Sequence, residues 1–176
     1  TGTRVSYLLS LKAVQSQAVG PVVINEIYYD GPGADSDDVF IEIYGPPGTS
    51  LDDYVLRAIN GNGGGIYAEI PLSSYSIGPS GFLVIGTPES AASVGAQVVS
   101  RLADLQNGPD NLILLKGSQV VDAVGYGQFQ SSDVFKGEGQ PAPGAPPGKS
   151  ISRDANHTDT NNNAADFKVS NPTPGR

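Results

Sequence analysis

Hydrophobic residues recur at every second position along residues 22–44. The first run puts Val22, Ile24, Glu26 and Tyr28 on one face and Val23, Asn25, Ile27 and Tyr29 on the other. The second run puts Val39, Ile41 and Ile43 opposite Phe40, Glu42 and Tyr44. β-Branched and aromatic residues at this period are typical of strands, and the intervening Asp-Gly-Pro-Gly supplies turn chemistry. The stretch therefore predicts two strands that meet across an acidic loop.

Short runs of the same kind continue along the chain, separated by Gly-rich and Pro-rich turns, and no long segment has helical periodicity. We expect further strands at residues 54–60, 66–70, 81–86, 97–99, 111–116, 119–126, 150–153 and 165–169. One helical turn or a loop is expected at residues 90–96, and a polyproline surface loop at residues 136–149. The expected core residues are Ile24, Ile27, Phe40, Ile41, Leu56, Val84, Leu114 and Val124. The pattern predicts an all-β protein with two packed antiparallel sheets.

The N-terminal residues 1–14 alternate in the same way, with Val5, Tyr7, Leu9 and Leu11 on one face. A strand of this length spans about 43 Å at roughly 3.3 Å per residue. A compact domain of this size is only about 40 Å across. We therefore hypothesise that these four residues form an interface in which the strand pairs with a neighbouring subunit. The alternative is a bent first strand on the domain's own sheet. Residues 1–20 are thus an arm and link, and residues 21–176 the sandwich domain.

Three motifs resemble a known family. They are INEI, an acidic loop and FIEIY at residues 24–44; DNLILLKGSQVVDAVGYG at 110–127; and SISRDANHTDTNNNAADF with NPTPG near the end. In this order they resemble the lamin tail domain, in its bacterial, secreted form. The resemblance implies an immunoglobulin-like β-sandwich, located outside the cell or on its surface. It implies no reaction, because such folds host many functions. The N-terminal strand lies outside the resemblance and is expected in addition to this sandwich.

The amino-acid composition argues against several classes of function. The net charge is −8, and eight carboxylates and no base lie between Lys12 and Arg57: Glu26, Asp30, Asp35, Asp37, Asp38, Glu42, Asp52 and Asp53. A nucleic-acid partner is not expected, because binding one needs a basic face. Cysteine is absent, so no disulfide framework or thiolate site forms. No apolar run is long enough to cross a bilayer as a helix, so no transmembrane segment is expected.

No catalytic residues are predicted. The single histidine, His157, lies in an Asn-rich loop without a recognisable nucleophile turn, and we interpret it as a loop residue. Glu26 and Glu42 lie within strands among apolar neighbours. Paired carboxylates serve acid–base chemistry only in a pocket that separates their pKa values. We interpret these two as carboxylates satisfied by backbone donors or by arginine.

Calcium is the one cofactor considered, because it binds oxygen ligands. Residues 154–166 offer such oxygens, and the candidate metal ligands are Asp154, Asn156, Thr158, Asp159 and Asp166. The start of this run is similar to an EF-hand loop, but its sixth and twelfth positions are Asp159 and Ala165, which excludes a true EF-hand. The alternative is that Asp and Asn cap turns with their own side chains. A second acidic loop, at residues 35–38, is a weaker candidate, and Asn156 begins a glycosylation sequon.

Taken together, the sequence predicts a non-enzymatic, extracellular structural or adhesive β-sandwich that self-associates through its N-terminal strand. The alternative is an accessory or carbohydrate-binding module of a larger secreted hydrolase. In that case Tyr28, Tyr29 and Tyr44 are the candidates for stacking on sugars.

Overall fold

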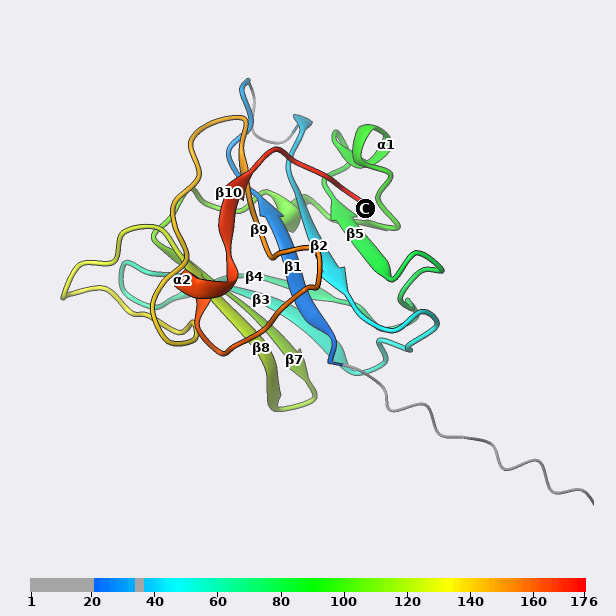
Figure 1. The fold of residues 1–176 in the computed structure, drawn as a ribbon, viewed down its shortest axis with the longest axis horizontal. Coiled ribbons are helices and arrows are strands. Elements are labelled where there is room, and N and C mark those ends of the chain that lie inside the picture. Colours follow the sequence, from blue (N-terminus) through cyan, green and yellow to red (C-terminus); the bar gives the residue numbers. More distant parts are fainter. Residues whose placement is uncertain (1–20, 34–36) are drawn as a thin grey trace, which may run out of the picture.

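A computed structural model describes residues 21–33 and 37–176, and these residues form two packed β-sheets (Figure 1). One sheet has six strands in the order β10-β9-β1-β2-β5-β6, and the other has four in the order β4-β3-β7-β8. Paired strands are antiparallel, apart from the parallel pair β5 and β6. Strands make up 36% of the structure and helices 8%. The prediction of an all-β, immunoglobulin-like sandwich is therefore confirmed, and its additional N-terminal strand lies outside the described residues.

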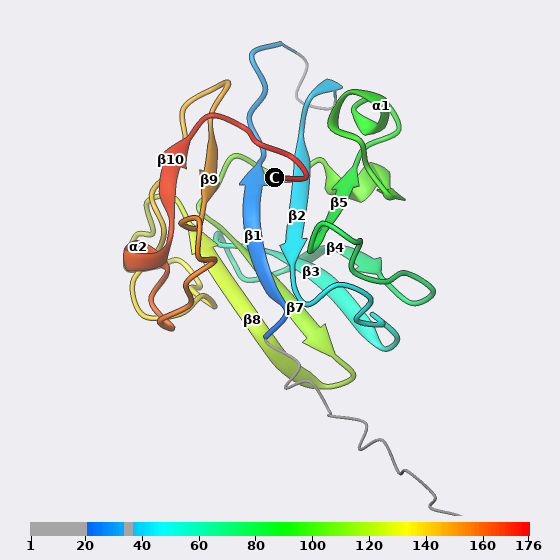
Figure 2. The same cartoon turned by 45° about the vertical axis from the view of Figure 1, so that its right-hand side comes forward.

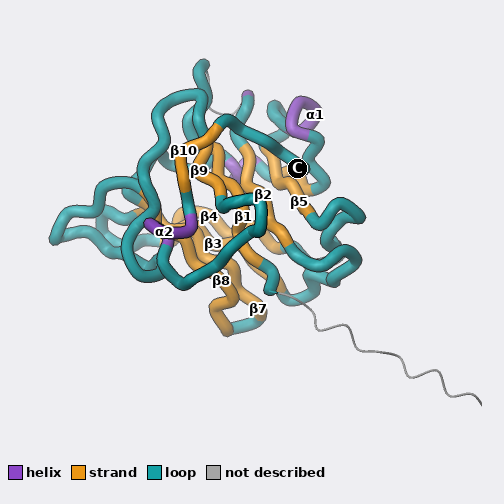
Figure 3. The backbone as a smooth tube through the Cα atoms, in the orientation of Figure 1, coloured by secondary structure: helices purple, strands orange, loops and turns teal. Residues whose placement is uncertain are grey.

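The strands are short and mostly follow the predicted ranges (Figure 3). The strand expected at residues 165–169 was partly wrong, because residues 163–166 form a helical turn and the strand begins at Lys168. The six-stranded sheet comprises β1 (Val23–Tyr28), β2 (Phe40–Tyr44), β5 (Phe82–Gly86), β6 (Val98–Val99), β9 (Ser150–Ser152) and β10 (Lys168–Ser170). The four-stranded sheet comprises β3 (Tyr54–Asn60), β4 (Ile66–Pro71), β7 (Asp110–Lys116) and β8 (Gln119–Tyr126). Three single helical turns connect them: α1 (Ala91–Val94), η2 (Arg101–Ala103) and α2 (Asn163–Asp166).

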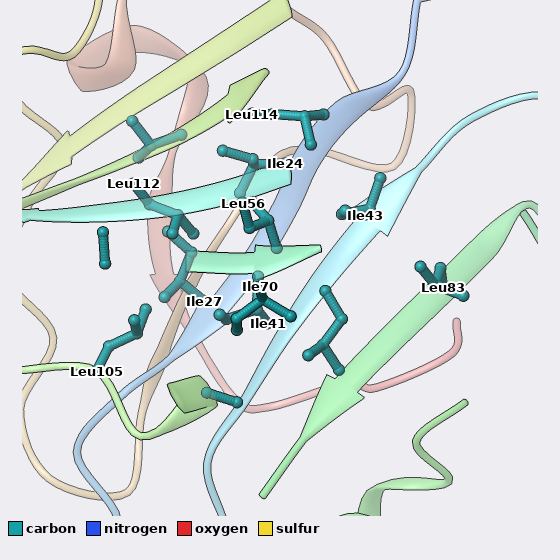
Figure 4. Packing of buried hydrophobic residues seen from close by; sticks show 14 of the residues in the cluster. Ile24, Ile27, Ile41, Ile43, Leu56, Ile70, Leu83, Leu105, Leu112 and Leu114 are labelled. Atoms are coloured by element: carbon teal, nitrogen blue, oxygen red, sulfur yellow. The ribbon is translucent and has the colours of Figure 1, made fainter. Parts of the chain in front are cut away.

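The main core lies between the two sheets and is filled by branched aliphatic side chains (Figure 4). All eight residues predicted for the core are at most 1% exposed. Two of them, Phe40 and Val84, pack with Tyr28 in a second cluster, to which Val94 and Ala96 add partly buried side chains. This second cluster involves outward-facing residues of β1, β2 and β5, so both faces of the six-stranded sheet bury apolar groups near α1.

A β-bulge in β1 changes the face assignment that simple alternation gives. The register between β1 and β2 shifts between Ile24 and Glu26. Ile24 and Ile27, three residues apart, consequently both belong to the main core. The predicted separation of these two residues onto opposite faces was wrong, because a bulge inserts one extra residue and reverses the alternation after it. The extra residue is Asn25, whose side chain bonds Glu42 on the neighbouring strand.

One sheet edge is partly covered, at residues 123–126 of β8. The side chain of Asn163 bonds both Ala123 and Gly125 at 2.9 Å, and Ala142 bridges to Tyr126. α2 supplies Asn163, and the predicted Pro-rich loop supplies Ala142, which is 1% exposed. The prediction of a simple surface loop was therefore incomplete, because part of residues 136–149 seals a sheet edge.

The predicted self-association arm, with Val5, Tyr7, Leu9 and Leu11, lies outside the described residues. In the part of the chain that the structure describes, no helix is long and apolar enough to cross a membrane.

Candidate functional site

A buried arginine joins four parts of the chain. Arg153 follows β9 directly, and its side chain is fully buried. Its Nε donates to the carbonyl of Ile24 at 2.9 Å, and its Nη2 contacts both oxygens of Asp122 at 3.1 and 3.2 Å. Its Nη1 contacts the carbonyl of Thr158 at 2.7 Å and Asp166 at 3.3 Å. Arg153 therefore links β1, β8, the loop after β9 and α2.

The partner of Arg153 on β8 is itself a link between the sheets. Asp122 is fully buried and accepts the backbone N–H of Ile24 at 2.7 Å. Burial raises the pKa of Asp122, although the charge of Arg153 and the bond from Ile24 act in the opposite direction. Desolvation of two charges largely cancels their attraction in such a pair, so its main effect is to fix one arrangement of the sheets.

The three predicted carboxylate ligands, Asp154, Asp159 and Asp166, do not form one group of oxygens within 4.8 Å of one another. Asp154 instead accepts the N–H groups of Asn156 and Thr158 and the hydroxyl of Thr158, at 2.9–3.1 Å. Asp166 accepts the N–H and hydroxyl of Thr160. Both carboxylates thus cap turns, which is the alternative that the sequence left open. Of the weaker candidate loop at residues 35–38, only residues 37 and 38 lie in the described part.

Three carboxylates of a different set lie close together. Asp122, Glu138 and Asp159 bring carboxylate oxygens within 4.8 Å of one another, and only Asp159 belongs to the predicted set. Burial, together with Asp122 and Asp159, raises the pKa of Glu138 to about 7. Among the buried side-chain oxygens of the described residues, Glu138 Oε2 is the one without a hydrogen-bond partner. Arg153 already supplies a cation to this group, through its contacts with Asp122 and Asp159.

A second buried polar group lies on the outer face of the six-stranded sheet. Glu26 on β1 and Glu42 on β2 are direct cross-strand partners, and both are fully buried. Glu26 accepts the hydroxyl of Ser150 at 2.5 Å, and Glu42 accepts the side-chain amide of Asn25 at 2.8 Å. The bulge explains this arrangement, because it brings Asn25 and Glu26 to the same face as Glu42. The sequence indicated satisfied carboxylates, and the structure adds that none of these partners is an arginine.

His157 connects to the same group through Asn25. Its Nδ1 lies 2.8 Å from Asn25 Oδ1, and its ring stacks on Tyr44 with centroids 3.5 Å apart. Since the Asn25 amide nitrogen donates to Glu42, its oxygen accepts, and His157 Nδ1 carries the proton. Burial lowers the pKa of His157. A chain of hydrogen bonds thus runs from Glu42 through Asn25 to His157.

A cavity of about 300 Å³ lies beside this chain. Its lining includes Asn25, Phe82, Arg153, His157 and Arg176. The cavity offers amide, imidazole and guanidinium groups next to an aromatic ring. Ser152, Asp154 and Thr173 also line it. The hydroxyl of Ser152 bonds that of Ser170 at 2.9 Å, and His157 Nδ1 bonds Asn25.

The three tyrosines considered for sugar binding do not form a solvent-facing row. Tyr28 and Tyr29 are buried, and Tyr29 stacks on Tyr126 with centroids 4.6 Å apart. Tyr44 is half-buried beneath His157. A stacking platform for a sugar needs exposed ring faces, which these positions lack.

The fold and these sites define the chain as a β-sandwich with two buried polar groups. Comparison with models of protein families, with curated proteins and with solved structures finds no match. The lamin tail resemblance therefore stays a prediction that rests on the three sequence motifs.

Proposed function

We propose that this protein is a non-enzymatic structural or adhesive module of the cell surface or extracellular space, which self-associates through residues 1–14. The observation that carries the structural role is the use of the buried carboxylates. Glu26, Glu42 and Asp122 each accept hydrogen bonds from at least two other residues of the chain. Carboxylates engaged in this way stabilise the native arrangement, because each donor would otherwise lie unpaired.

The extracellular placement is supported by the resemblance to the secreted members of the lamin tail family. The acidic net charge of −8 favours solubility and opposes binding to nucleic acid. Neither property requires a reaction or a cofactor.

Self-association is supported by the edges of the two sheets. Each of the four edge strands carries one exposed β-branched residue, and these are Ile66 on β4, Val99 on β6, Val120 on β8 and Val169 on β10. Their exposed fractions range from 43% to 59%. An exposed apolar residue on a sheet edge is a favourable neighbour for a donated strand with an apolar face. The alternating face of the arm, Val5 to Leu11, supplies such a strand.

The experiment compares particle size for the full chain, for residues 15–176, and for four variants that place lysine at the edge positions. These variants are I66K, V99K, V120K and V169K. The matched control is Tyr75→Lys, because Tyr75 is also an exposed apolar side chain (36%) but lies outside the strands. Deletion and at least one edge variant should give a folded monomer, whereas the control should assemble as the full chain does. If no edge lysine weakens the assembly, strand donation to an edge is contradicted.

A further inference from the structure

Residues 171–176, here called the strap, cross the outer face of the six-stranded sheet. They leave the end of β10 and run over β1 and β2 toward β5 (Figures 1 and 2). The strap is held by Glu26 and Glu42. Thr173 donates its N–H to Glu26 at 3.0 Å and its hydroxyl at 2.8 Å, and Gly175 donates its N–H to Glu42 at 2.6 Å.

The sequence of the strap explains why Thr173 and Gly175 donate these hydrogen bonds. Pro172 and Pro174 have no N–H, so donors occur at alternate positions, on Thr173 and Gly175. Residues 173–176 form a turn, in which Gly175 has φ +80° and the N–H of Arg176 donates to the carbonyl of Thr173 at 3.3 Å. In this turn the donors of Thr173 and Gly175 both reach the carboxylate pair. The two acceptors are adjacent as well, because Glu26 and Glu42 are cross-strand partners. The spacing of donors therefore matches the spacing of carboxylates.

Among the described residues, no cation contacts either carboxylate. The residue of β5 opposite Glu42 is Val84, which carries no charge, and β9 contributes the hydroxyl of Ser150. On the β1 side, Asn25 connects Glu42 to His157, whose lowered pKa favours the neutral ring. Arg153, Asp154 and Arg176 line the cavity beside Thr173, and Asp38 lines the hollow beside Pro172 and Pro174. Lys149 bonds the side chain of Asn171 at the start of the strap. Arg153 is already paired with carboxylates of the other buried group.

The strap buries two adjacent carboxylates that have no counter-ion. Burial disfavours two charges side by side, so it favours protonation of the pair. Burial, with a contribution from Glu26, raises the pKa of Glu42 to about 7, despite the bonds from Gly175 and Asn25. Burial also raises the pKa of Glu26. When the strap lifts, water reaches both groups and their pKa values return toward the ordinary range. Proton binding and strap closure are therefore linked, and each favours the other.

We propose that the strap is a proton-controlled cover, closed when the Glu26–Glu42 pair holds a proton and lifted when both carboxylates are ionised. The two states differ in whether the outer face of β1 and β2 is accessible. This device is independent of self-association through the arm, because it involves neither residues 1–14 nor the exposed edge residues.

Lifting the strap would change the surface substantially. Thr173 and Arg176 form part of the wall of the 300 Å³ cavity. Pro172 and Pro174 line a second hollow, of about 480 Å³, together with Tyr28 and Phe40. Both hollows border β1, on either side of Glu26. Without the strap they join into one groove, with the two carboxylates at its centre and aromatic rings beyond them.

The test measures hydrogen exchange of the Thr173 and Gly175 amides in the full chain by NMR, from pH 5 to pH 8.5. The protection factor is the intrinsic exchange rate at each pH divided by the observed rate. The direct effect of pH on amide exchange therefore cancels. Protection of both amides should fall as pH rises to about 7, by up to about tenfold per pH unit, and then level off. Amides of β7 serve as the internal control and should keep their protection.

The variant Glu42→Gln separates the proposal from a general loosening of the domain. Glutamine is neutral at every pH, so the protection of Thr173 and Gly175 should depend much less on pH in E42Q, with only the titration of Glu26 left to contribute. Equal protection at all pH values in the wild-type chain would overturn the proposal. So would an unchanged pH dependence in E42Q, or a parallel loss of protection in β7. The wild-type comparison stands even if E42Q does not fold.

Discussion

Ile24 and Asp122 are 98 residues apart in sequence and are joined by a 2.7 Å hydrogen bond from the backbone N–H of Ile24 to Asp122 Oδ2. Ile24 lies on β1 of the six-stranded sheet, and Asp122 lies on β8 of the four-stranded sheet. The backbone carbonyl of Ile24 meanwhile accepts from Arg153, which also pairs with Asp122. One residue pair thus fixes how the two sheets meet at this side of the sandwich.

The first prediction concerns this link. Arg153→Met should lower the free energy of unfolding by about 3–5 kcal/mol, because it leaves Asp122 buried without its cation. Denaturant unfolding measures the loss. The control is Arg57→Met, since Arg57 and Glu69 form an ion pair that is 35% and 50% exposed, and such pairs contribute about 1 kcal/mol or less. A loss for Arg153 no larger than that for Arg57 would mean that the buried pair does not hold the sheets.

The second prediction concerns the outer apolar cluster. Phe40 is 1% exposed and packs edge-to-face on Tyr28 with ring centroids 5.8 Å apart. Phe40→Ala should cost about 3–5 kcal/mol, as expected for a large side chain removed from a packed site. Val120→Ala, at a 59% exposed position, should change stability by no more than about 0.5 kcal/mol. A cost below about 1 kcal/mol for Phe40 would contradict the packing of this face.

The third prediction concerns the pH dependence of stability. Burial raises the pKa of Glu42 and of Glu138 to about 7, from an ordinary value of 4.5. A raised carboxyl pKa means that the folded state binds the proton more tightly than the unfolded state. The resulting stability is fully present below pH 4.5 and is lost as pH rises toward 7.

His157 and Asp166 act in the opposite direction. Burial lowers the pKa of His157, and hydrogen bonds lower that of Asp166 despite its burial, so both contributions are lost as the solution becomes acidic. Between pH 5 and pH 8 the two carboxyl groups outweigh the single histidine, because Asp166 titrates below this range. The urea midpoint should therefore be higher near pH 5 than at pH 8. In E42Q the decline between these values should be smaller. A midpoint that rises steadily from pH 5 to pH 8 would show that these two carboxyl groups are ionised in the folded state.

The fourth prediction concerns calcium. Asp154 and Asp166 already accept donors from their own turns. Millimolar calcium should therefore leave the melting temperature of chelator-treated protein unchanged. A ligand of the native state would raise it by mass action. If calcium does raise it, substitution of Glu138 and of Asp154 would show which acidic group binds the ion.

The strands could be predicted from the sequence because a half-buried strand needs alternation, and alternation is local. The core-facing residues of β2, β3, β7 and β8 follow from it directly. Burial of the opposite face of β2 and β7 does not, because alternation predicts only one buried face. The bulge at Asn25 could not be predicted in the same way. It is an extra residue whose only trace in the sequence is a polar side chain within an apolar run, and its place depends on pairing with β2.

The polar groups were foreseen in part. The isolated carboxylates of Glu26 and Glu42 within apolar strands indicated internal hydrogen bonds, and the structure contains them. Their partner in the strap, Thr173, lies 147 residues from Glu26. Arg153 was assigned no role, because nothing near it in the sequence reveals that Asp122 lies opposite. Contacts between distant segments depend on the packing of the whole chain, which local periodicity does not encode.

Light scattering over a hundredfold range of concentration, on the intact chain and on residues 15–176, decides whether the protein self-associates through its N-terminal arm. The mass of the intact chain should grow with concentration, and the truncated chain should remain a folded monomer throughout. An intact chain that stays monomeric at the highest concentration, or a truncated chain that unfolds, would contradict this self-association and assign the arm to the sandwich of its own subunit.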